Sequence, residues 1–546
     1  MKRILTLTMA LSLACSGLAV AAEAEGEVTS ITYFGVNANA GSGELTGGLG
    51  KFFEDRGLSI EVVPYSTEKL QAQLASGDLA DVIWLPQQEM LTAADSGLII
   101  PLDEYIDDMP NIQAHADLFD PSFAFAREYN SNDTGNLYYI GQVGPSMLNV
   151  AADTERNAIK MNWEIYAEAG YPEFSTLEEI IPVMKKMQET RPQTEDGLPT
   201  YGMNLFSDFD TDHFWNMNSI YCLLGKQETY LGWGVEYDVL TQTGTSIFAD
   251  GSVYYRGLKF MFEMNQAGLV DPDSLSQTRS TAWEKIHSGA ALAGWSGDPG
   301  WESDGYYPVV FDEFLPTYST ASSFPTGGYC ISSTCENVEA AVQFLDILAS
   351  EEDLLTLWSG YPGDDRRWNY DENGVPTITE TFAEALAAGT ELELPADETI
   401  NFWNITYLLS SGYVHEYGTS YNYTLFPSYY DYVYSSDLAK DWTELYGYTY
   451  LRELIEDKEW PVANQTEGFA AFLTADDDVM LMTKAALKDI IVPGSWRMVF
   501  AADEAEFEAV WNEMKEKCES LGIDDVVQYK LDDIAQARET WASLNQ

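Results

Sequence analysis

The sequence predicts an α/β protein, organised either as two or three domains or as one large unit with two lobes. Three observations lead to this prediction. Strand-like and helix-like segments alternate in the N-terminal part, which is the pattern of parallel βαβ units. The chain has 546 residues, more than one ordinary domain holds. Hydrophobic residues make up 45% and charged residues 21%, so the chain is apolar enough to bury a sizeable core.

The N-terminal part is expected to contain a parallel sheet. Three segments are expected to be buried strands, residues 30–36, 58–63 and 81–85. A glycine-rich turn over residues 41–50 leads from the first strand into a helix. Between the second and third strands, Thr67 is expected to cap a helix that Gly77 ends. Because a helix separates each strand from the next, the strands are expected to run parallel.

Further helices are indicated by apolar side chains at helical spacing. Ser175 or Thr176 is expected to cap one of them, with Glu178 or Glu179 completing a capping box. Pro182 lies inside the apolar stripe of this helix and is expected to kink it. Later segments are a strand at residues 328–332 and helices at residues 338–348 and 507–518. No internal repeat or low-complexity linker separates them, so we expect lobes that interleave along the chain.

The chain is strongly acidic, with 88 Asp and Glu against 28 Lys and Arg and a formal charge of −60. This charge repels phosphate backbones and anionic lipid headgroups, which argues against nucleic-acid binding and electrostatic membrane docking. It also disfavours a polyanionic ligand, although a local arginine pocket could override the global field. High solubility is its simplest consequence. Trp (15) and Tyr (33) together outnumber Phe (24), which favours sites in partial contact with water.

The N-terminus is expected to be an export signal over residues 1–24. Lys2 and Arg3 precede an apolar run that is too short to span a bilayer. Cleavage before Cys15 would leave a lipidated cysteine, whereas cleavage after Ala21 would release a free protein. Both alternatives remain open, so the protein is expected to be anchored at the extracellular face of the cell membrane or to be secreted or periplasmic.

Five cysteines are too few for a disulfide framework in a chain of this size. Cys330 and Cys335 could form a local bridge, but buried free thiols are the preferred interpretation. The four histidines are scattered, and no Cys/His spacing indicates zinc. No metal and no cofactor are therefore predicted.

Five segments, taken in order, resemble a known family. They are residues 68–83 with Ser-Gly-Asp-Leu-Ala-Asp-Val, 98–103 with Ile-Pro-Leu-Asp, 163–179 with Gly-Tyr-Pro, 328–345 with Gly-Tyr-Cys-Ile-Ser, and 360–374 with Arg-Trp-Asn-Tyr. Each segment is weak evidence alone, but their order makes them jointly specific. The chain is similar to bacterial extracellular solute-binding proteins, in the branch of long oligosaccharide-type lipoproteins that serve ABC importers.

This resemblance implies a bilobal fold of the periplasmic-binding-protein type, class II-like, with a hinge and a ligand cleft between two α/β lobes. The implied lobes are residues 27–147 with 322–362, and residues 148–321 with 363–546. A monomer that delivers its ligand to ABC transporter permease subunits is expected. Some long members carry a calcium loop near residues 193–200, but this chain lacks the alternating oxygen ligands there, so calcium is not predicted.

Candidate ligand-binding residues follow from the rule that ligands of open α/β sheets lie beyond the carboxyl ends of the strands. The first five are Asn37, Asn39, Trp84, Gln87 and Gln142. The most suggestive segment is residues 294–301, in which Trp295, Asp298 and Trp301 stand among glycines. An exposed indole suits the apolar face of a sugar ring, while carboxylate or amide groups bind its hydroxyls. In the alternative interpretation, Trp295 caps a core.

Other residues, most of them aromatic, are weaker candidates. They are a second group of Asp208, Trp215 and Trp233, and the lesser candidates Arg367, Trp368 and Trp403. Packing is the preferred alternative for the second group, and a structural salt bridge is the alternative for Arg367. Trp283 is expected to lie in the core. The tyrosine-rich residues 421–434 fit a sugar groove and a packing surface equally well.

These features predict a protein that captures an oligosaccharide by hinge closure and delivers it to a permease without altering it. Import of a peptide or another solute remains an alternative, as does hydrolysis of a glycoside by an exported enzyme. A hydrolase needs two carboxylates at a defined spacing, which 88 acidic residues do not single out. Motifs for a serine nucleophile, a zinc protease and a dinucleotide site are all incomplete. A surface adhesin is disfavoured because repeats are absent.

Overall fold

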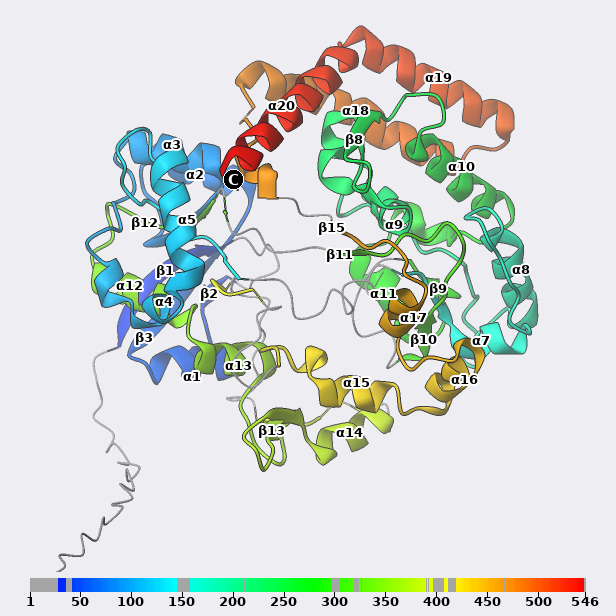
Figure 1. Ribbon diagram of the computed structural model, residues 1–546, viewed down its shortest axis with the longest axis horizontal. Helices are drawn as coiled ribbons and strands as arrows, with labels where there is room; N and C mark the ends of the chain where they lie inside the picture. Colours follow the sequence, from blue (N-terminus) through cyan, green and yellow to red (C-terminus); the bar gives the residue numbers. More distant parts are fainter. Residues whose placement is uncertain are drawn as a thin grey trace, which may run out of the picture.

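The computed structural model describes residues 28–35, 42–144, 158–210, 212–295, 304–318, 324–325, 327–388, 390, 392–395, 407–410, 419–464, 468–474 and 476–544. Figure 1 shows that they form two bodies. We call the body around a five-stranded sheet the N-terminal lobe. The body formed by the described parts of residues 158–318 and 437–544 is the C-terminal lobe. The bridging segment, residues 360–388 and 419–436, runs between the lobes along the lower edge of the view.

The N-terminal lobe is built on a sheet with the strand order β12-β4-β1-β3-β2. The strands are β1 (Thr29–Gly35), β2 (Gly43–Glu44), β3 (Leu58–Pro64), β4 (Val82–Leu85) and β12 (Gly328–Ile331). As the alternation of strands and helices predicted, β1 pairs in parallel with β3 and β4. β12 pairs antiparallel with β4, so the strand predicted at residues 328–332 extends the sheet of the N-terminal lobe.

Helices cover this sheet and contribute to its core. They are α1 (Gly47–Glu54), α2 (Thr67–Ser76), α3 (Gln87–Asp95), η1 (Ile106–Asp108), α4 (Pro110–Ala114), α5 (Ala116–Tyr129), α12 (Val338–Ile347) and α13 (Glu351–Ser359). Ser66, not Thr67, caps α2, because its Oγ accepts a hydrogen bond from the Lys69 amide at 3.2 Å. Within the core, the hydroxyls of Tyr33 and Tyr329 lie 2.8 Å apart and join β1 to β12.

The C-terminal lobe combines small sheets with many helices. Its first half contains β5 (Lys160–Asn162), α7 (Trp163–Glu168), α8 (Ile180–Thr190), α9 (Met217–Leu223), β6 (Lys226–Gln227), η2 (Glu228–Trp233), β7 (Val235–Asp238), β8 (Thr243–Ser246), α10 (Val253–Gln266), η3 (Pro272–Leu275), α11 (Arg279–His287), β9 (Ala293–Gly294), β10 (Tyr306–Pro308) and β11 (Thr317–Tyr318). Its second half contains α16 (Asp437–Tyr446), α17 (Leu451–Asp457), β15 (Ala463–Asn464), η7 (Gly468–Phe472), α18 (Asp478–Val499), α19 (Glu504–Ser520) and α20 (Ile523–Leu544).

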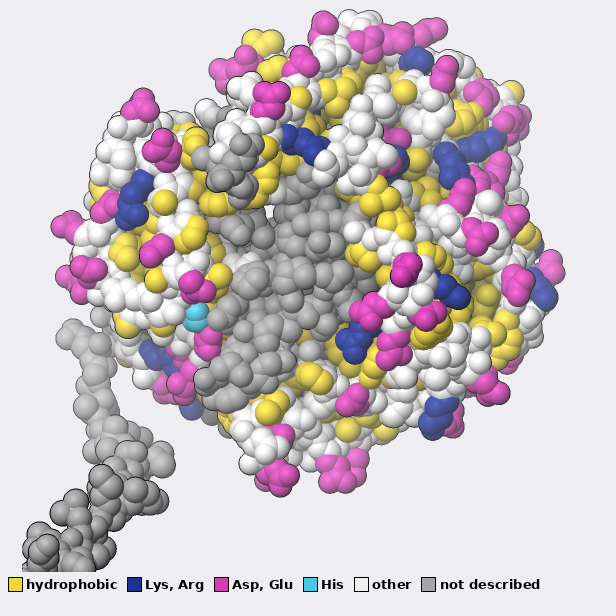
Figure 2. All heavy atoms as spheres, viewed as in Figure 1, with side chains coloured by type: hydrophobic (Ala, Val, Ile, Leu, Met, Phe, Trp, Pro, Cys, Tyr) yellow, Lys and Arg dark blue, Asp and Glu magenta, His cyan; other side chains and the backbone are white. Residues whose placement is uncertain are grey.

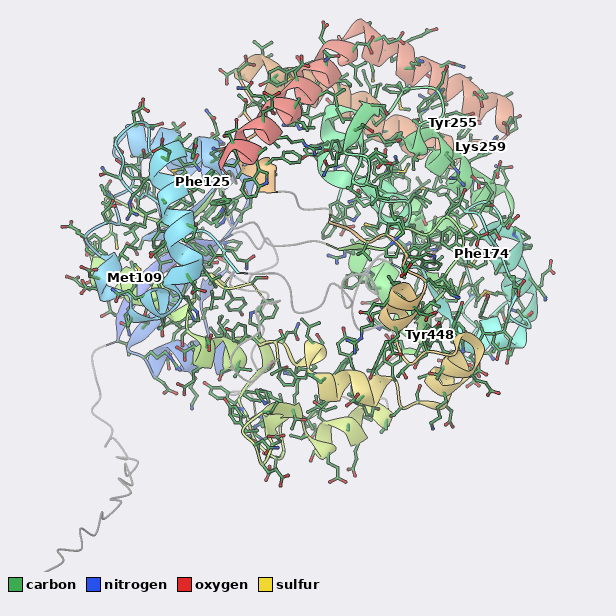
Figure 3. The ribbon with its side chains drawn as sticks, in the orientation of Figure 1. Met109, Phe125, Phe174, Tyr255, Lys259 and Tyr448 are labelled. Atoms are coloured by element: carbon green, nitrogen blue, oxygen red, sulfur yellow. The ribbon has the colours of Figure 1, made fainter. Side chains whose placement is uncertain are left out.

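Helices α18 and α19 pack against α10, and polar contacts join α10 to α19. Tyr255 and Lys259 of α10 bind Glu508 and Glu504 of α19, respectively (Figure 3). The apolar stripe predicted at residues 507–518 is the buried face of α19. Figure 2 shows Asp and Glu side chains spread over the periphery of both lobes, where water solvates their charge.

The predicted helix around Pro182 begins later than its capping box suggested. The amide of Glu179 donates to Thr176 Oγ1 at 3.4 Å, and the Glu179 carboxylate accepts from the Ser175 amide at 2.7 Å. These contacts form a turn, and α8 starts only at Ile180. Pro182 therefore lies in the first turn of α8, where an amide has no intrahelical partner to lose, and not inside the helix as predicted.

The bridging segment joins α13 to the C-terminal lobe. It contains β13 (Trp368–Tyr370), β14 (Pro376–Ile378), α14 (Glu380–Ala387), η6 (Tyr423–Leu425) and α15 (Pro427–Val433). Within the tyrosine-rich residues 421–434, Tyr421, Phe426, Tyr429 and Tyr434 are buried, and Tyr423, Tyr430 and Tyr432 are half-buried. This burial favours the packing interpretation of these rings over a sugar groove.

Three chain segments meet at the carboxyl ends of β4 and β1: residues 140–143, the start of β12 and residues 407–410. Ile140 bridges to Tyr329, and Val143 bridges to Leu409. The approach is so close that a Cβ on Gly328 would lie 2.4 Å from the Ile140 carbonyl oxygen, which only glycine avoids. Cys330 is buried on β12 and Cys335, which lies near Asp81 before β4, is half-buried; both are free thiols, as preferred from the sequence.

Candidate functional site

A small cavity lies in the C-terminal lobe between the start of α9, α11 and β9. Its volume is about 30 Å³, enough for about two water-sized groups. It is lined by Met203, Asn204, Leu205, Phe206, Asn216, Ser219, Ala282, Trp283, Ile286, Ala293 and Trp295. The lining therefore combines two indole rings with amide and hydroxyl groups, which is the composition expected of a sugar-binding wall.

Asn204 is the unusual member of this lining. Its Oδ1 and Nδ2 are both buried, and neither has a hydrogen-bond partner among the described residues. Buried amide groups are normally paired, because an unpaired one loses its contacts with water without compensation. The neighbouring Asn216 is fully occupied, since it accepts from the amide and donates to the carbonyl of Phe206. Asn204 thus offers one donor and one acceptor to a molecule that enters the cavity.

A strip of half-buried rings continues from the cavity. The Arg279 guanidinium lies 3.9 Å from the ring centre of Trp283 and 4.8 Å from that of Phe209. Phe209 in turn lies 5.4 Å from Trp215, whose other neighbour is the stacked imidazole of His213 at 5.7 Å. The Arg279 guanidinium thus lies over both Trp283 and Phe209, and ring contacts continue from Phe209 through Trp215 to His213.

Trp295 occupies a different position from the one predicted. It was expected on an exposed turn, but its side chain is only 7% exposed. β9 ends immediately before it and pairs with β5 inside a sheet, so the indole is directed into the lobe. There it packs on Phe260 at 5.5 Å and donates a hydrogen bond to the Gly202 carbonyl at 2.6 Å. The cavity therefore meets the wall that Trp295 forms and not a free indole face.

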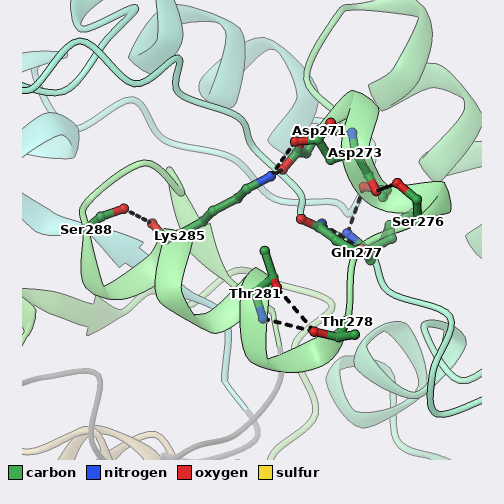
Figure 4. Close-up of polar contacts among 10 residues, drawn as sticks. Asp271, Asp273, Ser276, Gln277, Thr278, Thr281, Lys285 and Ser288 are labelled. Carbon is green, nitrogen blue, oxygen red and sulfur yellow. Dashed lines mark hydrogen bonds and ion pairs between the residues drawn. The ribbon is translucent and has the colours of Figure 1, made fainter.

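Trp283 was expected in the core, yet it is half-buried and shares the cavity with Trp295. Its helix, α11, is fixed from both ends. Asp208 is exposed and accepts a hydrogen bond from the Arg279 amide at 2.9 Å, at the start of the helix. Lys285 lies near the other end and contacts Asp271 at 2.5 Å and Asp273 at 3.0 Å (Figure 4).

These carboxylates anchor α11 strongly because Asp271 is buried. Burial alone would lower the pKa of Lys285, but its hydrogen bonds to Asp271 and Asp273 outweigh burial and raise that pKa. Gln277, also shown in Figure 4, donates to the Leu205 carbonyl at 2.7 Å and ties the turn before α11 to the Asn204 segment. The wall of the cavity is therefore preorganised by polar contacts behind it.

Asp210 holds the Trp215 end of the strip in place through hydrogen bonds. Its two carboxylate oxygens accept from the Trp215 amide at 2.9 Å and from the Trp496 indole nitrogen at 2.6 Å. Burial raises the pKa of Asp210 even though both donors act to lower it. Trp233, the third residue of the predicted second group, is 8% exposed, and the ammonium groups of Lys484 and Lys530 lie 3.7 and 4.5 Å from its ring centre. Its surroundings are those of a packing residue.

The candidates of the N-terminal lobe gather where the chain segments cross. Trp84 is half-buried on β4, opposite Tyr329. Gln87 follows β4 and donates to Asn130 Oδ1 at 2.6 Å. Gln142 is exposed and donates to the Tyr407 carbonyl at 3.0 Å. Their position at the carboxyl end of β4 agrees with the strand-end rule that selected them.

The remaining candidates lie in the bridging segment or outside the described residues. The Arg367 guanidinium lies 5.8 Å from the ring centre of Tyr423. Trp368 is buried, and its indole nitrogen donates to the Gly360 carbonyl at 2.7 Å. Asn37, Asn39, Asp298, Trp301, Trp403 and Cys15 fall outside the described residues.

Sequence reasoning missed Asn204, Phe209 and Arg279. Only one weak signal could have indicated Asn204, namely its position as an amide in the otherwise apolar run of residues 202–206. Arg279 and Phe209 are separated in sequence from each other and carry no motif, so their contact depends on tertiary structure.

A second, larger hollow of about 410 Å³ lies at the opposite edge of the N-terminal sheet. It is lined by Val28, Ser30, Glu44, Glu54, Ser59 and Glu61. Because it is at the amino ends of β1 and β3 and holds three carboxyl groups, it does not share the chemistry of the strand-end candidates. Within the described part of the chain, no group of three or more His, Cys, Asp and Glu residues is placed to hold a metal ion.

The structure has two lobes, and chain segments cross between them. Candidate ligand-binding residues lie at this crossing and on the C-terminal lobe, which is the arrangement of a bilobal binding protein. The chain belongs to the bacterial extracellular solute-binding protein family, whose model matches residues 42–354, more than half of the sequence. The family resemblance and the fold class predicted from the sequence are thereby confirmed. In the described residues, none of the helices combines the length and the apolar character needed to cross a membrane.

Solved structures show the same architecture. The S. pneumoniae ABC-transporter substrate binding protein FusA in complex with kestose gives a TM-score of 0.58 at 16% identity, over 94% of this chain and 100% of that one. An HMO-binding, ABC-transporter-associated solute binding protein from Bifidobacterium longum infantis gives 0.55 at 14% identity, over 93% and 98%. Alginate-binding protein AlgQ2 without calcium ion gives 0.56 at 12% identity, over 94% and 99%. A search of curated proteins found no match.

Proposed function

We propose that this protein is the substrate-binding component of an ABC importer and that it captures a neutral oligosaccharide between its lobes. The observation that carries this proposal is the unpaired amide of Asn204 beside the half-buried indole of Trp283. A sugar ring has an apolar face and a fringe of hydroxyls, so it needs one aromatic surface and several donors and acceptors. Beyond Trp283, the half-buried rings of Phe209 and Trp215 offer further aromatic surface to a sugar.

Proteins of similar fold support a saccharide as the ligand. FusA was solved with kestose, the Bifidobacterium protein is described as HMO-binding, and AlgQ2 as alginate-binding. The charge of −60 favours an uncharged ligand over an acidic one such as a uronic-acid chain.

In this proposal, the protein captures the oligosaccharide by closing its two lobes about a hinge. A sugar that touches both lobes binds the closed arrangement better and shifts the population toward it, which a permease then recognises. We assign residues 27–147 with 322–362 to the first lobe and residues 148–321 with 363–546 to the second, so that most of the bridging segment is counted with the second lobe. Trp84, Gln87 and Gln142 would contact the ligand from the first lobe, and Asp208, Trp215 and Trp295 from the second. Arg367 would contribute from the bridging segment. A monomer with micromolar affinity, about −8 kcal/mol, would hold scarce sugar yet release it.

The proposed location is the extracellular side of the cell membrane. The family is extracellular, and residues 1–24 have the composition of an export signal. Lipidation at Cys15 would tether the protein, and cleavage after Ala21 would release it. The same proposal excludes hydrolysis, so an oligosaccharide recovered after long incubation with the protein should be intact by chromatography.

The test is calorimetry and thermal unfolding with kestose, an alginate oligosaccharide and a peptide mixture. We expect kestose or another neutral oligosaccharide to raise the melting temperature, and the alginate oligosaccharide and peptides to leave it unchanged. Trp283→Ala and Asn204→Ala should each lower the affinity at least tenfold. Trp295→Ala should also lower the affinity at least tenfold, because it removes the indole that forms one wall of the cavity. Tyr448→Ala is the control, because Tyr448 lies on the C-terminal lobe near α17 (Figure 3).

Asn204→Ala separates binding from folding. Because the replaced amide is unpaired, its loss should leave the stability of the ligand-free protein unchanged or raise it, while binding weakens. If the Trp283 and Asn204 variants bind the oligosaccharide as tightly as the original protein, these residues are not part of the binding site. Stabilisation by peptides alone would reject the oligosaccharide as the ligand.

A further inference from the structure

An aromatic cluster joins the two lobes on the side opposite the bridging segment. Its five rings, the interlobe cluster, are Phe125, Tyr129, Phe324, Phe472 and Trp541. Phe125 and Tyr129 lie on α5, and Phe324 precedes β12, so these three belong to the N-terminal lobe. Phe472 ends η7 and Trp541 lies in the last turns of α20, in the C-terminal lobe. Figure 1 shows the end of α20 beside the N-terminal lobe, and Figure 3 places Phe125 at this junction.

The rings meet in the geometry that aromatic side chains prefer. Phe472 lies 5.3 Å from Phe125 and 5.2 Å from Tyr129, with its ring nearly perpendicular to both, at 83° and 84°. Phe324 lies 5.4 Å from Trp541 at 72°. Edge-to-face pairs at these distances are attractive beyond the apolar area that they bury. Each of these pairs joins a ring of one lobe to a ring of the other.

Each half of the cluster is fixed to its own lobe. On the N-terminal side, the Tyr139 hydroxyl donates to the carbonyl of Pro325, the residue after Phe324, at 2.6 Å. On the C-terminal side, the Thr474 amide donates to Asp533 Oδ1 at 2.9 Å, which ties the segment after η7 to α20. The Trp541 indole lies directly on Gly468, where an added Cβ would be 2.5 Å from the ring. The rings therefore move with the lobes that carry them.

We propose that the interlobe cluster is a clasp that must break each time the two lobes part. The chain crossings and the bridging segment remain covalently connected during any hinge motion, whereas the cluster is held only by contact. Because it stabilises the closed arrangement, the clasp slows release of whatever the lobes enclose. The part of this inference that concerns a ligand rests on the proposed function, but the opening of the lobes does not.

Small-angle X-ray scattering of the protein without added ligand tests the clasp directly. We expect a larger radius of gyration for Trp541→Ala and Phe472→Ala than for the original protein. Tyr448→Ala removes a ring from the same lobe at a site away from the cluster and should leave the radius unchanged. Tyr129→Ala is a mild variant that is expected to fold normally, because Tyr129 is 44% exposed and its contact with Phe472 is its part in the clasp.

Sulfate gives an independent readout. Because Tyr129→Ala removes one contact of the clasp, we expect its radius of gyration to exceed that of the original protein. Apolar contacts strengthen in sulfate, so this radius should return toward the original value as sulfate is added. Identical scattering of all variants, with only their melting temperatures lowered, would overturn the clasp and show a permanent core between the lobes.

Dissociation kinetics of a bound oligosaccharide extend the test. We expect release at least tenfold faster from Trp541→Ala than from the original protein, with an association rate that does not fall. An unchanged release rate would overturn the kinetic role of the clasp. If no oligosaccharide binds at all, the proposed function fails, while the scattering result still decides whether the clasp exists.

Discussion

The indole nitrogen of Trp295 donates a hydrogen bond to the carbonyl oxygen of Gly202 at 2.6 Å. This bond joins the end of β9 to the segment that carries Asn204, so the two sides of the cavity form one rigid wall. The Trp295 indole therefore supports the site structurally. We expect its loss to lower the free energy of unfolding of the protein.

Two substitutions of Trp295 should therefore destabilise the protein to different degrees. Trp295→Phe keeps a ring against Phe260 but removes the donor, at a cost of about 1–2 kcal/mol in the free energy of unfolding. Trp295→Ala also leaves a cavity and should cost about 3–5 kcal/mol. Urea unfolding followed by circular dichroism measures both values. Equal stability of the Phe variant and the original protein would show that the hydrogen bond adds nothing.

A buried ion pair in α20 gives a second stability prediction. Lys530 and Asp533 are 2.9 Å apart with side chains 3% and 4% exposed, and burial lowers the pKa of the lysine. Lys530→Met leaves a buried carboxylate without its cation and should cost about 3–5 kcal/mol. The double variant Lys530→Met with Asp533→Asn should recover part of this loss, because the amide oxygen still accepts from Thr474. Denaturant midpoints of the original protein, the two single variants Lys530→Met and Asp533→Asn, and the double variant check it; strictly additive losses would contradict the coupling.

Alkaline pH should destabilise the folded chain. Burial raises the pKa of Tyr446 to about 12, and a hydrogen bond to Asp441, followed by burial, raises that of Tyr171 to about 12. Unfolded tyrosines ionise near pH 10, so between about pH 10 and 12 the unfolded state loses protons that the folded state keeps. Stability contributed by the neutral phenols is thus complete below pH 10 and falls as the pH rises. Calorimetric melting temperatures from pH 8 to 11 should decline, less steeply for Tyr171→Phe; parallel curves would exclude Tyr171 as a contributor.

Acid should weaken the contact between α10 and the turn before α8. Arg256 binds both carboxylate oxygens of Glu178 at 2.7 Å and Glu313 at 2.6 Å, and it holds the pKa of Glu178 below its usual value. The stabilisation is present above about pH 4.5 and is lost as the pH falls through the lowered pKa of Glu178. Arg256→Lys loses the paired geometry and should cost about 1 kcal/mol at pH 7, because the groups are partly exposed. Urea midpoints at pH 7 and pH 3 should show the difference shrinking in acid.

The N-terminal sheet was predictable because each of its signals is local. Strands β1, β3 and β4 are short apolar runs bounded by turns, and the helix stop at Gly77 needs only a residue that accepts the left-handed conformation, with φ of 74°. The position of Pro182 was misjudged because a capping box fixes where a turn forms and not where regular helix begins.

The candidate site was predictable only in part. The strand-end rule brought Trp84, Gln87 and Gln142 to one edge, because topology alone places them there. The exposure of Trp295 and Trp283 was misjudged, because exposure depends on which sheet and which helix lie over each indole. Asn204 could not be identified, since it is the tertiary structure that leaves its amide without a partner among the described residues.

The pairing of β12 with β4 has a consequence for synthesis of the chain. β4 is translated early, whereas β12 leaves the ribosome only after much of the C-terminal lobe. Until then the nascent N-terminal sheet exposes the backbone edge of β4, a surface prone to pair with other chains. Truncated products that end before Gly328 should therefore aggregate, and a chaperone that binds extended segments would have its longest period of access at this strand.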